Sequence, residues 1–195
     1  MRIGILGGTF DPPHAGHIAL AEAAVAQLEL DEVIFVPASR NPLKEVRSSH
    51  PKDRLEMTRR AISRNEKFCV SDIEIARGGK SYTIETLTEL QIAHPGEYWI
   101  IMGTDALREF PRWRTPEKIL LKSRLAVALR APQKKEEILA LIPDWLPEHI
   151  DWINAPVLEV SSSEIRVRAQ DKRRPFGQWL AKDVLDYIGE KKLYK

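Results

Sequence analysis

The stretch RIGILGGTFDPPHAGH, from Arg2 to His17, predicts a strand, a turn and the start of a helix. Its first part, RIGILG, is apolar, partly β-branched and closed by glycine, which is typical of a buried strand. After the turn, apolar residues recur at helical spacing: Ile18, Ala21, Val25 and Leu28. They predict a helix over about residues 15–28 that turns one face toward the core.

Strands and helices alternate along nearly the whole chain. Further strands are predicted at residues 32–37, 68–75, 97–103, 124–130 and 151–153. Further helices are predicted at residues 52–63, 81–94, 104–110, 134–141, 161–170 and 179–194, with Ser81 or Thr83 as the cap of the second. This alternation indicates an α/β fold, a doubly wound, Rossmann-like parallel sheet with helices on both faces and C-terminal helices. We expect residues 1–195 to form a single domain.

The composition limits the classes of partner. Lys and Arg total 30 against 28 Asp and Glu, so the formal net charge is only +2. Such a balance gives no reason to expect nucleic-acid or membrane partners, and an anionic ligand needs a local cluster of charge instead. No apolar run approaches the roughly 20 residues of a membrane helix, and the short apolar start lacks the features of a signal peptide.

Cysteine usage adds a second limit. Cys69 is the only cysteine, which excludes a disulfide within the chain and leaves zinc at most one thiolate ligand. This usage suits a reducing cytosol, so we expect a cytoplasmic protein.

The turn after the first predicted strand has the features of an anion-binding site. Gly7 and Gly8 lack a Cβ, so a ligand can approach their backbone, and the helix that follows offers unpaired N–H groups at its positive end. His14 and His17 are three residues apart and therefore lie on one side of that helix, with Gly16 leaving space between them. In a doubly wound sheet, ligands bind at the carboxyl ends of the strands, where this turn is expected to lie.

Two other interpretations of this turn stay open. Glycine-rich connections between strand and helix are common and are often purely structural. A metal site is the other alternative, with Cys69 or His50 as a third ligand from a distant part of the chain. The spacing matches neither GxxxxGK[ST] nor GxGxxG, so neither the P-loop nor the dinucleotide fingerprint applies.

A second stretch with the character of an anion site is VSSSEIR, from Val160 to Arg166. Its three serines, Ser161, Ser162 and Ser163, are natural helix caps, and Glu164 follows Ser161 at the spacing of a capping box. Arg166 lies one turn into the helix and offers a fork of donors suited to phosphate oxygens. The alternative is that Ser161 only caps the helix and that Arg166 is a solvated surface arginine.

Both stretches resemble signatures of a known superfamily. GTFDPPHAGH, from Gly8 to His17, resembles the first signature of the nucleotidylyltransferases, G-x-F-D-P-x-H-x-G-H, and VSSSEIR resembles the second. Three further stretches, GGKSYTIETL (78–87), MGTDAL (102–107) and FPRW (110–113), resemble bacterial nicotinate-mononucleotide adenylyltransferases. The resemblance extends over nearly the whole chain, down to YIGEKKLY at residues 187–194.

The resemblance implies an enzyme that joins ATP and nicotinate mononucleotide into nicotinate adenine dinucleotide and releases pyrophosphate, a step of NAD biosynthesis. The catalytic residues it implies are His14, His17, Lys44 and Arg166. The implied ATP contacts are Gly7, Gly8, Thr9, Phe10, His14, His17, Gly103, Asp105, Ser161, Ser162, Ser163 and Arg166. The implied acceptor contacts are Thr9, Lys44, Ser81, Tyr82, Thr83 and Trp113. Mg²⁺ is expected to travel with ATP, because the first motif holds few carboxylates, and no resident metal is expected.

Individual roles follow from the same resemblance. Backbone N–H at Thr83 would hold the nicotinate carboxylate, and Trp113 would stack on the pyridine ring. Gly103 and Asp105 would meet ribose hydroxyls, and Lys44 would sit near phosphate. Without the resemblance, Trp113 reads as ordinary packing, Asp105 as a helix cap and Lys44 as one more loop lysine.

One loop departs from the family pattern. The family commonly has proline-proline-histidine-lysine after the second strand, whereas this chain has Asn41-Pro42-Leu43-Lys44, which keeps the lysine and replaces the imidazole. Alternatives to the implied function are an adenylyltransferase for nicotinamide mononucleotide or phosphopantetheine, a non-catalytic nucleotide-binding module, and a metal hydrolase using His14 and His17. The sequence leaves open whether the chain forms a homo-oligomer.

Overall fold

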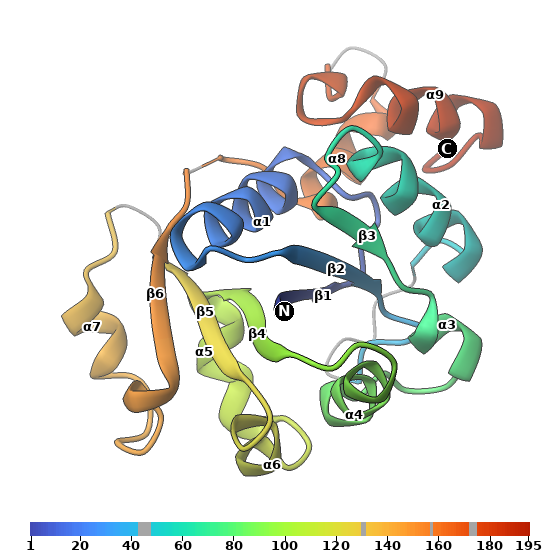
Figure 1. Ribbon diagram of the computed structural model, residues 1–195. Helices are drawn as coiled ribbons and strands as arrows, with labels where there is room; N and C mark the ends of the chain where they lie inside the picture. Colours follow the sequence, from blue (N-terminus) through green and yellow to red (C-terminus); the bar gives the residue numbers. More distant parts are fainter. Residues whose placement is uncertain (43–47, 130–131, 157, 172–174) are drawn as a thin grey trace.

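The computed structural model describes residues 1–42, 48–129, 132–156, 158–171 and 175–195. Among these residues, six parallel strands form one sheet in the order β3–β2–β1–β4–β5–β6 (Figure 1). The strands are β1 (Arg2–Gly8), β2 (Glu32–Pro37), β3 (Phe68–Val70), β4 (Glu97–Gly103), β5 (Arg124–Leu129) and β6 (Ile150–Asn154). The strand order reverses between β1 and β4, which confirms the predicted doubly wound α/β fold.

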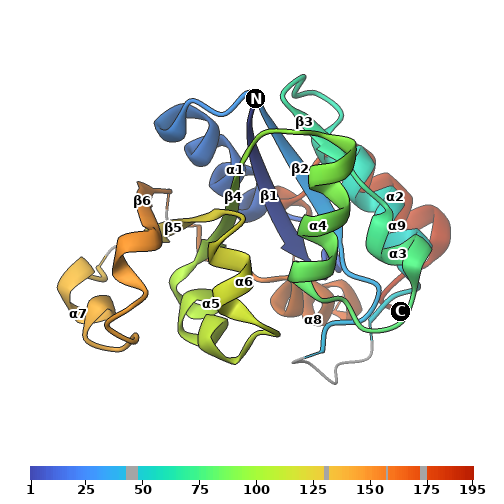
Figure 2. The same ribbon diagram turned by 60° about the horizontal axis from the view of Figure 1, so that its bottom comes forward.

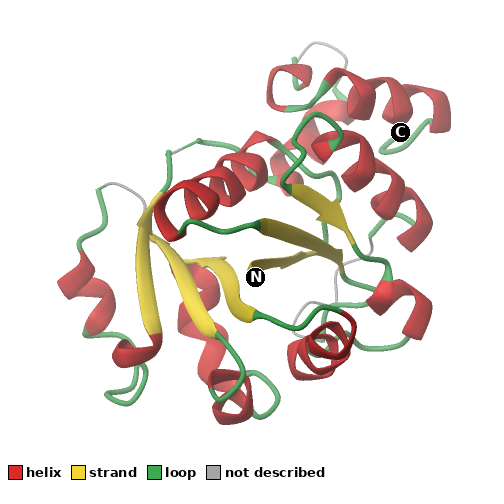
Figure 3. Ribbon diagram, in the orientation of Figure 1, coloured by secondary structure: helices red, strands yellow, loops and turns green. Residues whose placement is uncertain are grey.

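Helices cover both faces of this sheet (Figure 3). They are α1 (Ala15–Leu28), α2 (Pro51–Ile62), α3 (Ile73–Arg77), α4 (Thr83–Ala93), α5 (Thr104–Glu109), α6 (Pro116–Leu120), α7 (Lys135–Leu139), α8 (Ser162–Gln170) and α9 (Lys182–Lys191). Short 3₁₀ helices occupy Phe110–Arg112, Pro147–His149 and Gly177–Trp179. In the described part of the chain, no helix combines the length and the apolar character needed to span a bilayer.

The core divides into two clusters because side chains of a strand alternate between the faces. In β2, Val33 and Phe35 join the cluster with residues of α1, while Ile34 and Val36 join the cluster with residues of α4, α5 and α6. The ninth helix, α9, packs on α2 instead of on the sheet, through a small cluster that includes Met57 and Ile188. This arrangement brings the chain after α9 close to the beginning of α2.

One predicted strand is wrong over half its length. Residues 68–75 were expected to be one strand, but β3 ends at Val70 and residues from Ile73 form α3. Ser71 follows β3, and its N–H binds the carbonyl of Phe35 in β2. Glu74 is buried and accepts a 2.6 Å hydrogen bond from Thr86, so the apolar alternation around it belongs to a helix packed on α4.

Two smaller expectations also need correction. Neither Ser81 nor Thr83 caps α4, because the residue at the cap is Tyr82 and no side chain binds there. The Ser81 hydroxyl accepts instead from the N–H of Ser39, 2.9 Å away. The sequence analysis also missed α6, which begins at Pro116, a residue type that favours the first turn of a helix.

The fold places the carboxyl ends of β1 and β4 side by side at the reversal of strand order. Gly8 ends β1 and Gly103 ends β4. Figure 2 shows the arrowhead of β1 directed toward the side of the molecule where α8 lies. This crevice is where a doubly wound sheet binds its ligand.

We expect the substitution Phe35→Ala to lower the free energy of unfolding by about 3–5 kcal/mol, because it opens a cavity in the core. Phe35 is fully buried, and its ring lies 5.8 Å from Phe10 and 5.3 Å from Phe68 between ring centroids. Urea unfolding would measure the loss. Ile92→Ala is the matched control, since Ile92 is 79% exposed and its truncation should change stability by no more than about 0.5 kcal/mol. Equal losses in the two variants would contradict this account of the core.

Candidate active site

The structure brings the two sequence motifs into direct contact. Arg166 of α8 donates from Nη1 to the carbonyl oxygen of Asp11 at 2.7 Å. The hydroxyl of Ser162 donates to the carbonyl oxygen of Pro12 at 2.8 Å. The amino end of α8 is therefore fastened to the turn that leads from β1 to α1, although the two stretches lie about 150 residues apart in sequence.

His14 and His17 lie together at the start of α1. Nδ1 of His14 accepts from the N–H of Gly16 at 3.2 Å, and Nδ1 of His17 accepts from the N–H of His14 at 3.1 Å. A ring nitrogen that accepts a hydrogen bond carries no proton, so the neutral form of each ring carries its proton on Nε2. The ring centroids are 3.8 Å apart, which places two N–H donors of the same tautomer at one end of the helix.

Phe10 is the buried aromatic residue of the turn between β1 and α1. Its φ of 49° lies in the left-handed region, which costs a non-glycine residue about 1–3 kcal/mol and needs support from its surroundings. The ring is 1% exposed and meets the His17 imidazole edge-on at 5.0 Å. A Cβ on Gly8 would lie 3.0 Å from this ring, whereas one on Gly7 would meet no atom within 4 Å. Packing within the chain thus restricts Gly8, while Gly7 faces open space.

A buried arginine supports the same turn, and the sequence analysis missed it. Arg54 of α2 is 1% exposed and donates to three main-chain carbonyls: Thr9 at 2.8 Å, Ser39 at 3.0 Å and Ser49 at 3.1 Å. Burial lowers the pKa of the Arg54 guanidinium, and the charge of Asp11 opposes that effect. The turn, the loop after β2 and the approach to α2 are therefore held by one side chain.

Asp11 is the second residue that the sequence analysis left without a role. Its carboxylate is 1% exposed and accepts from the Tyr194 hydroxyl at 2.7 Å and from the N–H of Ser49 at 3.0 Å. Asp11 stood inside the first motif, so its place in the sequence was a signal. Tyr194 follows α9 and lies 183 residues away in sequence, and no local pattern pointed to it.

Ser81, one of the residues predicted to contact the acceptor substrate, binds the segment after β2. The Ser81 N–H binds the carbonyl of Arg40 at 2.9 Å, and Ser39 is shared between Ser81 and Arg54. Because Arg54 also binds Thr9, the segment with Ser81 lies beside the first motif. Trp113 is linked to the start of α4 through the residue that follows it, Arg114.

Arg114 makes that link between the Trp113 segment and α4. Its guanidinium lies 4.7 Å from the centroid of the Tyr82 ring and donates to Glu85 at 2.7 Å. The ring of Trp113 is half-buried and packs at 5.2 Å from Phe110. The structure thus brings Tyr82, Thr83 and the Trp113 segment together at the start of α4.

Two predicted ATP contacts, Gly103 and Asp105, lie at the junction of β4 and α5. Asp105 lies in the first turn of α5, is 85% exposed in its side chain, and pairs with Arg108 at 3.7 Å. Gly103, not Asp105, occupies the cap position of α5. Lys44 and Leu43 lie outside the described residues.

The stretch VSSSEIR, from Val160 to Arg166, forms half of the capping box expected from its sequence. Ser161 caps α8 by accepting from the N–H of Glu164 at 3.1 Å. The Glu164 carboxylate binds Arg168 at 2.6 Å, and no return bond to Ser161 completes the box in α8. The hydroxyl of Ser163 accepts from Nη2 of Arg166 at 3.1 Å, which orients that guanidinium.

The described residues contain no third ligand for a metal site with His14 and His17. Across residues 1–42, 48–129, 132–156, 158–171 and 175–195, no three side chains of His, Cys, Asp or Glu gather closely enough to hold an ion. His50 instead caps α2 by accepting from the N–H of Lys52 at 3.3 Å. Cys69 lies on β3, 3.9 Å from a carboxylate oxygen of Glu32.

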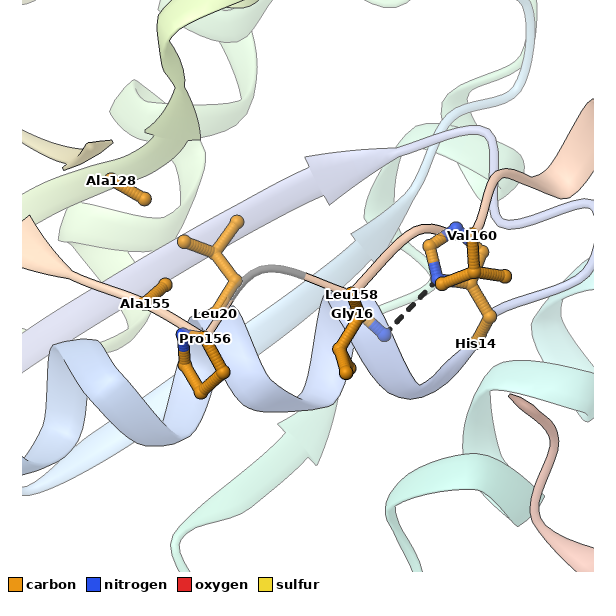
Figure 4. Close-up of a pocket in the computed structure, with 8 residues that line it drawn as sticks. All are labelled: His14, Gly16, Leu20, Ala128, Ala155, Pro156, Leu158 and Val160. Atoms are coloured by element: carbon orange, nitrogen blue, oxygen red, sulfur yellow. Dashed lines mark hydrogen bonds between the residues drawn. The ribbon is translucent and has the colours of Figure 1, made fainter. Parts of the chain in front are cut away.

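A small pocket adjoins His14 (Figure 4). Its lining runs from His14 and Gly16 along α1 to β5 and the segment before α8: His14, Gly16, Leu20, Ala128, Ala155, Pro156, Leu158 and Val160. Figure 4 shows His14 beside Val160 at one end and Ala128 at the other.

We expect Gly16→Ala to displace the His14 imidazole, because the new Cβ would lie 3.0 Å from its Nδ1 and 3.1 Å from its Cε1. The ¹⁵N resonances of the His14 ring should shift as its bond to the Gly16 N–H is disturbed. Gly189→Ala is the control, since a Cβ there in α9 meets nothing within 4 Å and leaves both imidazoles in place. Unchanged His14 resonances in Gly16→Ala would refute this packing argument.

Comparison with known proteins agrees with this geometry. A family model described as cytidylyltransferase-like matches residues 5–168. A probable nicotinate-nucleotide adenylyltransferase of Desulfitobacterium hafniense (strain Y51) is 40% identical, covering 100% of this chain and 96% of that protein. One of Roseiflexus sp. (strain RS-1), with the same name, is 41% identical, covering 99% of this chain and 98% of that protein.

A solved structure has the same fold. The nicotinic acid mononucleotide adenylyltransferase of Plasmodium falciparum, complexed with NaAD, superposes with a TM-score of 0.80 at 22% identity, covering 99% of this chain and 97% of that one. The similarity at this level of identity concerns the fold. From the family model and the full-length relatives, the chain belongs to the nicotinate-nucleotide adenylyltransferases within the cytidylyltransferase-like family.

Proposed function

We propose that this chain is an adenylyltransferase that joins ATP and nicotinate mononucleotide into nicotinate adenine dinucleotide and releases pyrophosphate, a step of NAD biosynthesis. The observation that carries the proposal is the contact of Arg166 and Ser162 with the carbonyls of Asp11 and Pro12. It brings two helix starts, each suited to anions, to one crevice at the reversal of strand order.

The chemistry needs little beyond positioning and charge. The 5′-phosphate of the acceptor attacks the α-phosphorus of ATP, a new P–O bond forms, and the bond to the β-phosphate breaks with its electrons on pyrophosphate. The attacking phosphate is already an anion at neutral pH, so no general base and no covalent enzyme intermediate are required. Alignment of the reacting atoms and stabilisation of charge then lower the barrier.

The histidine pair supplies the preorganised donors. With Nδ1 of each ring accepting from backbone, Nε2–H of His14 and His17 donates to α- and β-phosphate oxygens. Arg166 neutralises charge on the triphosphate, and its bonds to Asp11 and Ser163 fix the direction of the fork. Lys44 is assigned the same task from the sequence.

The remaining parts of ATP have places along the crevice. The backbone from Gly7 to Phe10 and the serines that start α8 flank the phosphates. Gly103, at the end of β4, and Asp105, in the first turn of α5, meet ribose hydroxyls. Mg²⁺ arrives as part of the ATP substrate. We place the reaction in the cytoplasm, because a chain with a single cysteine suits a reducing compartment.

The acceptor lies between α4 and the Trp113 segment. The cap residue Tyr82 makes no side-chain cap bond at the start of α4, so the first N–H groups and the positive end of this helix are suited to the nicotinate carboxylate at Thr83. Trp113 stacks on the pyridine ring. Ser81 and Tyr82 are fastened to neighbouring segments through Ser39 and Arg114, which keeps the start of α4 in place.

We expect His17→Ala to fold normally and to lose about 10²–10³-fold in kcat, the usual cost of removing one preorganised donor. The substitution also removes the acceptor for the His14 N–H, which should lower stability by only about 1 kcal/mol. Pyrophosphate release and urea unfolding would measure the two effects. His94→Ala, at the exposed end of α4, is the control and should keep full turnover. Turnover of His17→Ala at the wild-type rate would end the assignment.

We expect kcat/KM for nicotinate mononucleotide to exceed that for nicotinamide mononucleotide by roughly tenfold or more, because hydrogen bonds from backbone N–H groups to a carboxylate are stronger than those to an amide. Pyrophosphate release with ATP and each of three acceptors, the two mononucleotides and phosphopantetheine, would measure the preference. Equal values for the two mononucleotides would contradict the role given to Thr83. Binding of ATP without release with any acceptor would indicate a non-catalytic module.

A further inference from the structure

The first motif depends on groups from other parts of the chain for its shape. Its backbone carries a left-handed residue, Phe10, and is fastened at Thr9 by Arg54, at Asp11 by Arg166 and at Pro12 by Ser162. All three of these bonds end on main-chain carbonyls. The Asp11 carboxylate, three residues before His14, is a side chain of the turn that is held through its own polar atoms.

The Asp11 carboxylate is held from outside by Tyr194. Oη of Tyr194 donates to Oδ1 of Asp11 at 2.7 Å, a distance typical of a charge-assisted bond, and the N–H of Ser49 binds Oδ2 at 3.0 Å. The carboxylate is 1% exposed, so water cannot replace a lost donor.

The backbone conformation after α9 places the Tyr194 hydroxyl beside Asp11. Lys192 and Tyr194 have φ values of 52° and 64°, so two of the three residues from 192 to 194 adopt the left-handed conformation. The N–H of Leu193 binds the carbonyl of Ile188 at 3.0 Å and closes the end of the helix. The Tyr194 ring packs on the cluster between α2 and α9, with its oxygen 3.7 Å from Sδ of Met57.

The electrostatics of the cluster keep Tyr194 a donor. Burial and the charge of Asp11 raise the pKa of the Tyr194 hydroxyl, and Arg166 on α8 opposes this effect. Arg54 on α2 also interacts with the charge of Asp11, and Arg166 binds the main-chain carbonyl of the same residue. A neutral hydroxyl adds a directional bond to Asp11 without adding charge.

We propose that Tyr194 is a positioning residue for the adenylyl transfer, whose hydroxyl bond to Asp11 sets the geometry of the turn that presents His14 and His17 to the triphosphate. The proposal rests on the proposed function for its kinetic consequence. Tyr194 touches no reacting atom and acts through Asp11. Loss of the bond should therefore disturb alignment, which is seen in kcat, more than ground-state binding, which is seen in KM.

The chain offers a matched control in Tyr187. Its hydroxyl donates to Oδ1 of Asp53 at 2.8 Å, also between α9 and α2 and also to a carboxylate, but Asp53 lies outside the turn. Tyr194→Phe and Tyr187→Phe each delete one hydroxyl and keep the ring. They should lower the urea midpoint to a similar degree, whereas only Tyr194→Phe reaches the first motif.

The experiment compares full-length wild type, Tyr194→Phe and Tyr187→Phe in pyrophosphate release with ATP and nicotinate mononucleotide. We expect Tyr194→Phe to lower kcat on the order of tenfold with both KM values within about twofold, and Tyr187→Phe to keep both parameters. Asp11→Asn should lower kcat as well, because a neutral amide oxygen accepts a weaker bond from Tyr194 than a carboxylate does. Its combination with Tyr194→Phe should lower kcat by less than the product of the two effects, because both changes act on the same bond. Equal kcat in the two Phe variants, whether unchanged or reduced, would overturn the proposal.

Histidine resonances separate this proposal from the proposed function. If wild type makes no dinucleotide, the proposed function fails, and the positioning role is then decided by ¹⁵N spectra of the imidazoles. Tyr194→Phe must shift the His14 and His17 resonances and Tyr187→Phe must leave them unchanged. Spectra of Tyr194→Phe that match wild type would refute the positioning role in either case.

Discussion

Arg54 carries a full charge in the interior, and its guanidinium ends on three main-chain carbonyls from three separate segments. Taking such a charge out of water costs several kcal/mol unless hydrogen bonds and an opposite charge offset it. The carbonyls of Thr9, Ser39 and Ser49 and the nearby Asp11 carboxylate provide that compensation. The turn and Arg54 depend on each other. Arg54 holds the turn, and the carbonyls of the turn offset the cost of burying the Arg54 charge.

This constraint explains why the site is assembled where the sheet reverses. The carboxyl ends of β1 and β4 diverge there, so backbone groups of the β1 turn face a crevice instead of a neighbouring strand. Arg54 approaches the turn from α2, and Arg166 approaches it from α8. Two arginines therefore hold the turn through its carbonyl groups. The N–H groups of His14 and Gly16 at the start of α1 orient the two imidazoles, so side-chain donors meet the negative charge of the ligand.

The sequence predicted those parts of the molecule whose causes are local. Continuous apolar runs bounded by proline or glycine predicted β2 and β4 closely, and the His14–His17 spacing predicted a pair on one helix face. Residues 68–75 were misread because Ile73 and Ile75 alternate like strand residues, and the burial of Glu74 depends on Thr86 of another helix. Arg54 and Tyr194 were missed for the same reason, since their partners in the turn lie 45 and 183 residues away.

The tautomers of His14 and His17 depend on the same turn that Arg54 and Tyr194 support, and they decide which ring nitrogen can donate to phosphate. A neutral imidazole donates to phosphate only from the nitrogen that keeps its proton, and backbone N–H groups at the start of α1 occupy both Nδ1 atoms. Those N–H groups belong to His14 and Gly16, so their direction follows from the path of the chain through Asp11 and Pro12. A shift of the turn would move the rings and weaken the bonds that select their tautomers at the same time. Rigid support of Asp11 is therefore a condition for having the right nitrogen protonated, as well as for having the rings in the right place.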